Sequence, residues 1–155
     1  MKVREVMITS VVTVMPRTTY EDAAFLLNKN HLSGMPVVDG ENKVIGVISE
    51  KDLFRALYPL YEEYVLEPHA YCNQEQREDD IEAIRKQPIE NLMSRKVISV
   101  GPDDPVLHAG GLMLAHNIHR LPVIKDEKLV GIVTREDIYG TILKKHLSGN
   151  TKKEE

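Results

Sequence analysis

The sequence is poor in cysteine and in aromatic residues, with one Cys, no Trp and two Phe among 155 residues. Because Cys72 has no second cysteine to pair with, an intramolecular disulfide, a redox pair and a cysteine metal knuckle are excluded. The few aromatic rings leave little on which the bases of a single strand can stack. The net charge of −4 supplies no basic surface for a phosphate backbone. We therefore expect no nucleic-acid partner.

Long apolar runs are missing as well. No stretch approaches the roughly 18 consecutive apolar residues that a membrane helix needs, so we expect no membrane partner. The first residues, MKVREVM, lead directly into patterned sequence without the apolar core and cleavage site of a secretory signal. We expect a cytoplasmic protein, and its hydrophobic fraction of 42% is sufficient for a buried core.

Motifs of catalysis are also lacking. The sequence contains no nucleophile elbow, Walker A loop, GxGxxG after a strand, or HExxH. His116 and His119 have the spacing of two metal ligands, but no third ligand accompanies them. We expect no catalytic residue, no metal site and no required cofactor. An enzyme that hydrolyses or transfers a nucleotide, with Asp137 or His119 as the base, stays an alternative.

What the sequence does contain is an internal duplication. Moving the chain against itself by 86 positions aligns residues 3–53 with residues 89–138, and the offset falls to 85 after one residue is lost in a turn. A register kept over so many positions is the mark of a repeat. The equivalent pairs include Met7/Met93, Val14/Val100, Ala23/Ala109, Pro36/Pro122, Gly46/Gly131 and Asp52/Asp137.

Each copy has the pattern of a β-α-β-β-α unit. The β-branched stretches at 11–14 and 97–100 predict a short strand, and apolar residues at helical spacing predict helices that begin near Tyr20 and Pro105. The segments MPVVDGENKVIGVIS and LPVIKDEKLVGIVT then predict two β-hairpins, each followed by a helix. One copy is too small to cover its own sheet. We expect an α/β (α+β) fold in which two repeats pack with pseudo-two-fold symmetry.

The copies account for most of the chain. We expect a first domain at 1–57, a helical linker or insert at 58–88, a second domain at 89–148 and a disordered tail at 149–155.

Two helices are expected around the insert. One runs from Leu53 to about Leu66 with a kink at Pro59, and an acidic one spans roughly Gln74 to Lys86. In the second copy, the glycines at 110–111 lie inside a helical pattern, which predicts close packing between helices. The insert region carries Tyr58, Tyr61, Tyr64 and Tyr71.

A hydroxyl residue precedes an aspartate by three positions where each hairpin gives way to its helix. Ser49 and Asp52 form this pair in the first copy, and Thr134 and Asp137 in the second. The pattern is close to a capping box, although that motif usually ends in Glu or Gln. A carboxylate there can instead accept hydrogen bonds from a cis-diol, and the helix N-terminus offers amides to an anion. Both interpretations stay open at this point.

The paired units resemble a tandem of cystathionine-β-synthase (CBS) domains, an arrangement also called a Bateman module. The resemblance is carried by VREVMITSVVTV and IENLMSRKVISV, by SGMPVVD and HRLPVIK, and by GVISEKD and GIVTRED. It implies an adenosine-containing ligand, such as AMP, ADP, ATP or S-adenosylmethionine, in clefts between the copies. It also implies a regulatory role toward a separate protein, and a homodimer. A structural or dimerisation module with degenerate clefts is the alternative.

The resemblance further implies two unequal sites. Asp137 and Asp52 would hold ribose hydroxyls, and His119-Arg120 matches a pair that contacts phosphate in the gamma subunit of AMP-activated kinase. The first copy has residues 33–34, Ser-Gly, in the equivalent places, where Lys51 is a nearby cation, so we expect the better phosphate site in the second copy. A solvated loop is the other interpretation of the His-Arg pair. The full set of candidates is Thr134, Asp137, His119, Arg120, Val97, Ile98, Pro122 and Arg135, with Ser49, Asp52, Lys51, Val11, Val12 and Pro36 as the first-copy set.

Overall fold

The computed structural model describes residues 1–58 and 74–147, and the chain divides into two compact units. We call Val12–Val97 the first-copy unit, and Ile98–Glu155 together with Met1–Val11 the second-copy unit. The predicted tail and three of the insert's tyrosines lie outside the described residues. The helix predicted from Leu53 to Leu66 instead begins at Glu50 and ends at Ala56, and its predicted part from residue 59 onward also lies outside the described residues.

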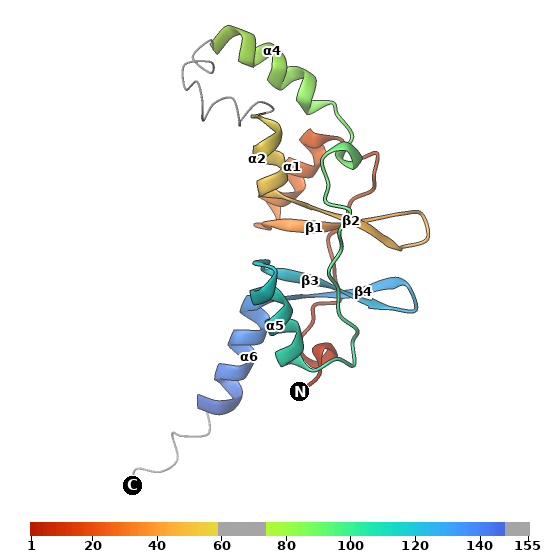
Figure 1. The fold of residues 1–155 in the computed structure, drawn as a ribbon, viewed down its shortest axis with the longest axis vertical. Coiled ribbons are helices and arrows are strands. Elements are labelled where there is room, and N and C mark those ends of the chain that lie inside the picture. Colours follow the sequence, from red (N-terminus) through yellow and green to blue (C-terminus); the bar gives the residue numbers. More distant parts are fainter. Residues whose placement is uncertain (59–73, 148–155) are drawn as a thin grey trace. The chain divides into compact units, whose positions relative to one another are not determined.

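The first-copy unit has a helix, a β-hairpin and a second helix in the predicted order (Figure 1). The two strands pair antiparallel, with Pro36 opposite Val47. The predicted acidic helix of the insert is confirmed as α4, and a short 3-10 turn follows it. The elements are α1 (Tyr20–Lys29), β1 (Gly34–Val38), β2 (Val44–Ser49), α2 (Glu50–Ala56), α4 (Gln74–Arg85) and η3 (Ile89–Asn91).

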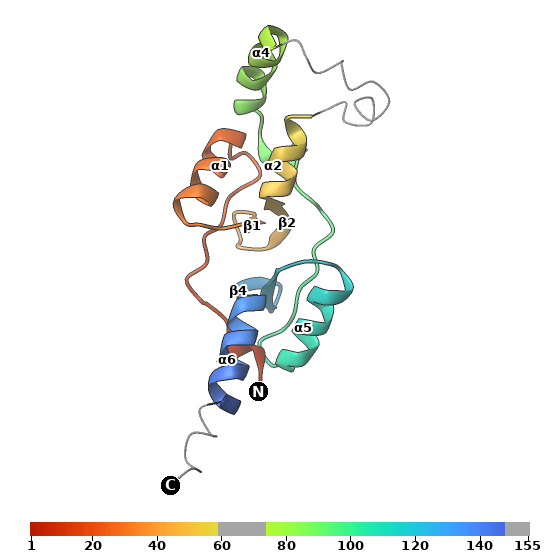
Figure 2. The same cartoon turned by 90° about the vertical axis from the view of Figure 1, so that its left-hand side faces the viewer.

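The second-copy unit repeats this plan without an insert. Its strands also pair antiparallel, with Pro122 opposite Ile132, and its two helices lie side by side, as α1 and α2 do (Figure 2). The mixed α/β class and the duplication are thereby confirmed. The elements are η1 (Val3–Glu5), α5 (Val106–Ala115), β3 (Arg120–Lys125), β4 (Lys128–Thr134) and α6 (Arg135–Leu147).

The strands predicted at 11–14 and 97–100 are shorter than expected. Val14 forms a single parallel bridge to β1, in which its amide donates to Pro36 O at 3.1 Å and its carbonyl accepts from Val38 N at 2.9 Å. Val100 makes the same bridge to β3. The chain passes from one unit to the other between Val11 and Val12 and between Val97 and Ile98. Because these points lie so close to Val14 and Val100, only one residue in each copy pairs with the hairpin strand.

The segment that precedes each bridge packs on the hairpin of the other copy. Ile8 and Ile132 exchange backbone hydrogen bonds of 2.8 and 2.9 Å, and Ser94 and Val47 exchange bonds of 2.9 and 3.0 Å. The compact units therefore differ from the copies read along the sequence, because each unit borrows the opening segment of the other copy.

Glycine permits this exchange at one position in each hairpin. A Cβ on Gly131 would lie 2.8 Å from Met7 Sδ and 3.0 Å from the carbonyl oxygen of Ile8. A Cβ on Gly46 would lie 2.6 Å from Met93 Sδ and 2.9 Å from Ser94 O. A Cβ at either position would force the neighbouring segment to shift, so the close approach of a second backbone favours glycine at both positions of the repeat.

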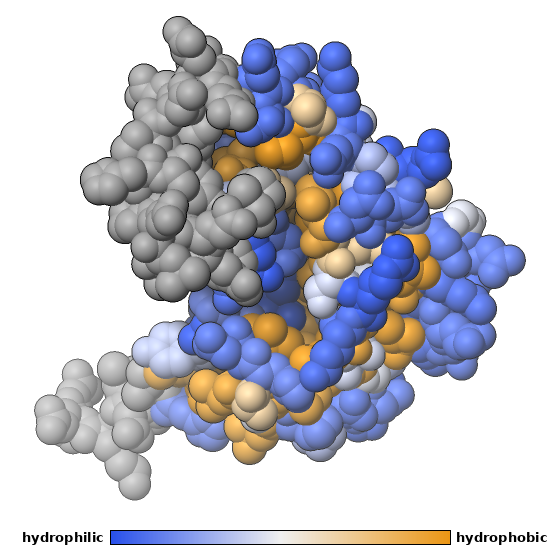
Figure 3. All heavy atoms as spheres, turned by 45° about the horizontal axis from the view of Figure 1, so that its top comes forward, coloured by the Kyte–Doolittle hydropathy of each residue, from blue (hydrophilic) through white to orange (hydrophobic). Residues whose placement is uncertain are grey.

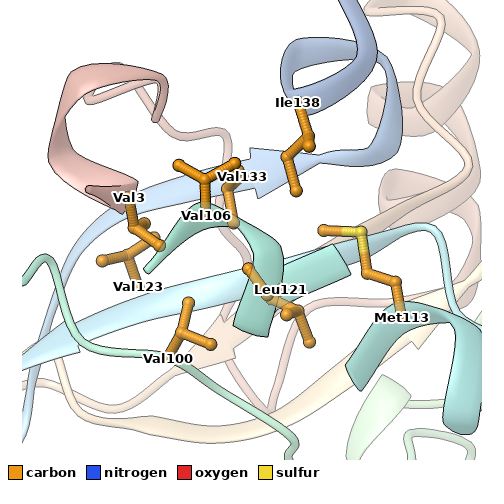
Figure 4. Packing of buried hydrophobic residues seen from close by; sticks show 9 residues of the cluster. Val3, Val100, Val106, Met113, Leu121, Val123, Val133 and Ile138 are labelled. Carbon is orange, nitrogen blue, oxygen red and sulfur yellow. The ribbon is translucent and has the colours of Figure 1, made fainter. Parts of the chain in front are cut away.

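Each unit has its own apolar core. The Val3 side chain, from the borrowed segment, is fully buried in the core of the second-copy unit (Figure 4). Ile89 and Met93 fill the corresponding place in the other core. Each fully buried side chain of this kind contributes about 1.5–3 kcal/mol relative to its exposed state. The second-copy core contains Val3, Val100, Val106, Ala109, Met113, Leu121, Val123, Val133 and Ile138.

Several apolar side chains also reach the surface, and Figure 3 shows hydrophobic spheres among hydrophilic ones on the face it presents. The most exposed are Leu107 and Leu114, both on α5. Close packing at Gly110 and Gly111 was predicted wrongly, since a Cβ on either would meet nothing within 4 Å. Among the described residues, every helix is too short or too polar to cross a membrane.

Candidate functional site

A capping box begins α6. Thr134 donates to Asp137 Oδ2 through its amide at 3.0 Å and through Oγ1 at 2.6 Å, and the Asp137 amide donates back to Oγ1 at 3.2 Å. Ser49 and Asp52 make the same three bonds at the start of α2, at 2.9, 2.8 and 3.3 Å. The cap interpretation is confirmed in both copies, with Asp in the place that Glu or Gln usually takes.

The cap uses only one oxygen of each carboxylate. Among the described residues, Oδ1 of Asp137 and Oδ1 of Asp52 accept no hydrogen bond, and both side chains are partly exposed. A carboxylate oxygen has room for two donors. Capping and ribose binding are therefore compatible functions of the same residue, since the cap orients the carboxylate and leaves its second oxygen open.

The helix N-termini offer fewer amides than predicted. The first amide of α6, from Arg135, donates to His119 O at 2.9 Å, and the first amide of α2 donates to Ser33 O at 3.0 Å. The third amide of each helix is held by the capping hydroxyl. Only the second amides, those of Glu136 and Lys51, have no such partner in the described ranges. An anion at either helix would meet one backbone donor here.

The ladder of the second-copy unit brings the His-Arg pair to the cap. Arg120 is directly opposite Thr134 in the β3–β4 register, so the two side chains project from the same face of the hairpin. His119 precedes β3, and its side chain is exposed, whereas Arg120 is half-buried. The structure thus gathers His119, Arg120, Thr134 and Asp137 at one end of the hairpin.

The same position of the first-copy unit has no side chain and leaves little space for one. Gly34 is directly opposite Ser49, and a Cβ on it would lie 3.1 Å from the carbonyl oxygen of Ile48. Lys51, the predicted substitute cation, is exposed at the second position of α2. Arg135 is exposed at the first position of α6, and the counterpart of Lys51 in the repeat is Glu136.

The predicted proline contacts lie within the hairpins, and the predicted adenine contacts lie where the chain changes unit. Pro36 and Pro122 are buried in β1 and β3, where their carbonyls accept the bridge hydrogen bonds at 3.1 Å. Ile98 packs on the second-copy core and Val12 on the first-copy core. Val11 and Val97 are half-buried residues at the two points where the chain changes unit. Their contacts with a ligand stay predictions.

A groove of about 570 Å³ lies next to Asp52 in the first-copy unit. One wall is α2 with Tyr58, two residues beyond its end, and the other is α4 of the insert with residues before, within and just after η3. The volume is within the range of small-molecule sites. The lining residues are Asp52, Arg55, Ala56, Tyr58, Asp80, Ala83, Ile84, Gln87, Asn91 and Leu92.

Two contacts with α1 hold the walls of this groove. Arg85 of α4 forms an ion pair with Glu21 at 2.8 Å, and the amide of Tyr20 donates to Gln87 O at 2.8 Å. The Tyr20 hydroxyl also donates to Leu53 O of α2 at 3.0 Å, and partial burial raises the pKa of this phenol. Tyr20 therefore acts as a neutral brace between α1 and α2.

Sequence reasoning missed this groove. Arg55 and Ala56 follow Asp52 by three and four residues, which places all three on one face of α2, and that spacing was readable in the sequence. The opposing wall could not be predicted from the sequence, because nothing in the spacing of Asp80 or Asn91 links the insert to α2. In the described parts of the chain, no group of three potential metal ligands comes together.

Comparison with known proteins places both copies in one family. The sequence model of the CBS domain matches residues 3–59 and 89–144. A protein of Methanocaldococcus jannaschii, MJ1426, is 31% identical over 156 aligned positions, which cover 90% of this chain and 93% of that protein.

Two solved structures resemble this chain in fold. The CBS domain pair of MJ0100, in complex with 5′-methylthioadenosine and S-adenosyl-L-methionine, superposes with a TM-score of 0.71 at 29% identity, covering 94% of this chain and 98% of the other. CBSX2 in complex with AMP superposes with a TM-score of 0.71 at 25% identity, covering 92% and 96%.

Proposed function

The chain belongs to the CBS domain family, with two copies of the domain, and from this premise we propose that it senses an adenosine-containing ligand and reports it to a separate protein. AMP, ADP, ATP and S-adenosylmethionine are the candidates. The ligands named in the MJ0100 and CBSX2 structures have adenosine in common. The recognition chemistry to look for is therefore that of a ribose with two neighbouring hydroxyl groups.

The observation that carries the proposal is the divided use of the Asp137 carboxylate. Its Oδ2 is committed to the cap, whereas its Oδ1 is open to a ribose hydroxyl. Because the cap already orders the side chain, ribose binding costs little further conformational entropy. The same argument applies to Asp52, whose cap is equivalent.

We propose that the second-copy unit binds the phosphate group of the ligand. Arg120, opposite Thr134, presents a planar guanidinium with several donors, which suits phosphate oxygens. His119 and the second amide of α6 would add donors on the same side. Val97 and Ile98, with Val11 and Val12 as counterparts, would offer apolar contacts to adenine, as the family resemblance implies.

Signalling requires that the ligand prefer one of two conformational states. We propose that the regulated partner is a separate protein and that no chemical step takes place at the site. Incubation of the protein with ATP, followed by chromatography of the nucleotides, tests the second point. Accumulation of ADP or AMP that is lost in the Asp137→Ala variant would replace the sensing function with an enzymatic one.

One observation favours a second function, assembly. Leu107 and Leu114 are 76% and 77% exposed on the outer face of α5, and Tyr139 is 66% exposed on α6. A homodimer would bury these side chains, and two-fold dimers are the commonest oligomers. Sedimentation velocity of the wild type and of Leu114→Glu tests this: a dimer that the charge dissociates supports assembly, and a wild-type monomer at high concentration contradicts it.

Thermal unfolding of ligand-stripped protein tests the sensing function. A ligand at 100 times its dissociation constant adds about 2.7 kcal/mol of stability. AMP, ADP, ATP and S-adenosylmethionine are each added at millimolar concentration, with inorganic phosphate as the control. If none of them moves the midpoint beyond the phosphate control, the protein is not an adenosine-ligand sensor.

The variant Asp137→Glu separates the two uses of the carboxylate. Glu is the usual closing residue of a capping box, so the cap and the midpoint without ligand are expected to persist. The longer side chain moves the second oxygen, so the AMP-induced shift is expected to disappear. Asp52→Glu is the matched variant, and it should leave the AMP shift largely intact.

A further inference from the structure

The two copies exchange the positions of an arginine and a glycine. At the start of the hairpin, the second copy has Arg120 where the first has Gly34. In the helix that follows the hairpin, the relation is reversed: the first copy has Arg55 where the second has Gly140. Each copy therefore keeps an arginine near its capping aspartate, but on a different element.

The helix arginine of the first copy faces the groove between α2 and α4. Arg55 comes three residues after Asp52, which is close to one helical turn, or roughly 5 Å along the axis. Its guanidinium makes no ion pair with any described residue. A ligand that starts at Asp52 Oδ1 and extends along α2 therefore arrives at a cation that no described residue neutralises.

The opposite wall carries an anion that pairs with none of the described residues. Asp80 of α4 lines the same groove and forms no ion pair within the described ranges, although its neighbour Glu82 pairs with Arg85 at 2.7 Å. Two carboxylates and one guanidinium thus face one cavity without neutralising one another. Ala56, Ile84 and Leu92 add apolar surface to the lining.

This charge pattern suits a ligand with charges of both signs and opposes a phosphate. A phosphate on Arg55 would share the groove with the Asp80 carboxylate, and like charges at short range disfavour binding. An α-amino acid fits better, because its carboxylate matches the guanidinium fork and its cationic part matches a carboxylate. With two acidic residues and one basic residue on the lining, a ligand with net positive charge is favoured.

We infer that the groove between α2 and α4 binds the amino-acid tail of an adenosyl amino acid of the S-adenosylmethionine class. Asp52 holds the ribose, Arg55 binds the tail carboxylate, and Asp80 faces the ammonium and sulfonium charges. The inference rests on the proposed adenosine-sensing function and deepens it: the first-copy site selects an adenosyl amino acid, and the second-copy site selects a phosphorylated adenosine. The insert helix is what gives the first-copy site its selectivity.

The test is calorimetric titration of the full chain with four ligands. These are S-adenosylmethionine, S-adenosylhomocysteine, which keeps the amino-acid tail, 5′-methylthioadenosine, which lacks it, and AMP. The variants are Arg55→Gln and Asp80→Asn, with Asp79→Asn as the matched control on an exposed residue of α4 outside the groove. Unfolding midpoints of all variants are measured first, and no change is expected because neither groove charge pairs with a described residue.

Arg55→Gln is expected to lower the affinity for S-adenosylmethionine and for S-adenosylhomocysteine about tenfold or more, which is the effect of losing one charge-assisted contact. Asp80→Asn is expected to lower the affinity for S-adenosylmethionine by a similar factor. Both variants should change the affinities for 5′-methylthioadenosine and AMP less than about twofold, and the Asp79→Asn control should change none of the four affinities.

The outcomes separate this inference from the sensing function. If the wild type binds AMP but not S-adenosylmethionine, or if both groove variants bind it as the wild type does, the inference is wrong and sensing survives. An equal loss of affinity for 5′-methylthioadenosine also overturns the inference, since that ligand has no tail for Arg55 to bind. If the wild type binds none of the four ligands, both proposals fall.

Discussion

In the second-copy unit an arginine begins the hairpin opposite Thr134, whereas in the first-copy unit the same ladder position is Gly34, with a carbonyl oxygen 3.1 Å from where a Cβ would be. The capping boxes that follow are nearly identical, with each distance within 0.2 Å of its counterpart. The duplication has therefore preserved the groups that order the site and changed the groups that give it charge. Differences between the copies are a better guide to ligand chemistry than their likeness.

The largest expected effect is on stability, and it concerns the glycine that both copies have at the same position of the hairpin. Gly131→Ala places a Cβ 2.8 Å from Met7 Sδ and 3.0 Å from Ile8 O, so the borrowed segment has to move away. Overpacking of this kind costs about 1–3 kcal/mol, and the two bridge hydrogen bonds add about 1 kcal/mol each if they break. We expect a loss of about 3 kcal/mol in the free energy of unfolding, measured by urea denaturation, and a similar loss for Gly46→Ala.

Gly110→Ala is the control for these variants. It lies in the middle of α5, where an added Cβ meets nothing within 4 Å, and alanine favours a helix over glycine by about 1 kcal/mol. This variant should be more stable than the wild type. If Gly131→Ala and Gly110→Ala behave alike, the close approach of the borrowed segment is not what selects glycine in the hairpin.

The next effect separates stability from binding. Asp137→Ala and Asp52→Ala each remove a cap, at an expected cost of about 1 kcal/mol, and the two losses should be equal because the caps are equivalent. Binding of AMP should fall for Asp137→Ala alone. Thermal unfolding with and without AMP measures both quantities. Equal losses of AMP binding in the two variants would contradict the assignment of phosphate to one copy.

Most of the fold followed from the repeat, but the exchange of segments did not. Both hairpins, the acidic helix α4 and the starts of α1 and α5 agree with the patterns in the sequence. The sequence cannot tell which hairpin the Met7 segment pairs with, because Gly46 and Gly131 offer the same space. A duplicated sequence specifies the kind of contact, whereas the choice between two equivalent partners depends on the path of the chain.

The candidate site was predictable where it depends on local sequence. The caps at Ser49 and Thr134 involve residues three apart, and the pairing of Arg120 with Thr134 follows from a short hairpin. The groove was not predictable, because it joins Arg55 to Asp80 across an insert with no counterpart in the other copy. Contacts within a motif are encoded locally, and contacts between a motif and an insertion are not.

A smaller effect is expected from the hairpin turns, which also differ. The second-copy turn places Asp126 and Glu127 at φ values of 50° and 66°, a conformation that costs most residues about 1 kcal/mol or more. Glu127→Gly should therefore raise the free energy of unfolding by about 0.5–1 kcal/mol. In the first copy the strained position is Asn42, with φ 63°, and Asn42→Gly should gain only a few tenths of a kcal/mol because asparagine tolerates this region. Chemical denaturation of both variants checks the difference.

The smallest effect is a pH dependence in the first-copy turn. Asp39 accepts hydrogen bonds from the amides of Lys43 and Glu41, both at 2.9 Å, and these bonds lower the pKa of its carboxyl group. A lowered folded-state pKa stabilises the protein above the unfolded value, near 3.9, and this contribution disappears as the pH falls through the folded value. Asp39→Asn should thus cost stability at pH 6 and less at pH 3, as measured by urea denaturation. A cost that is the same at both pH values would contradict the role of the ionised carboxylate.

The borrowed segments have a consequence for the order in which the protein is made. The first-copy unit needs Met93 and Ser94 to complete its core and its bridge, so it cannot finish folding when its own copy leaves the ribosome. The segment with Val3 and Met7 has to wait still longer, until β4 has been synthesised. During translation the early apolar residues are therefore exposed, and a ribosome paused within the insert would hold a chain in which neither unit is complete.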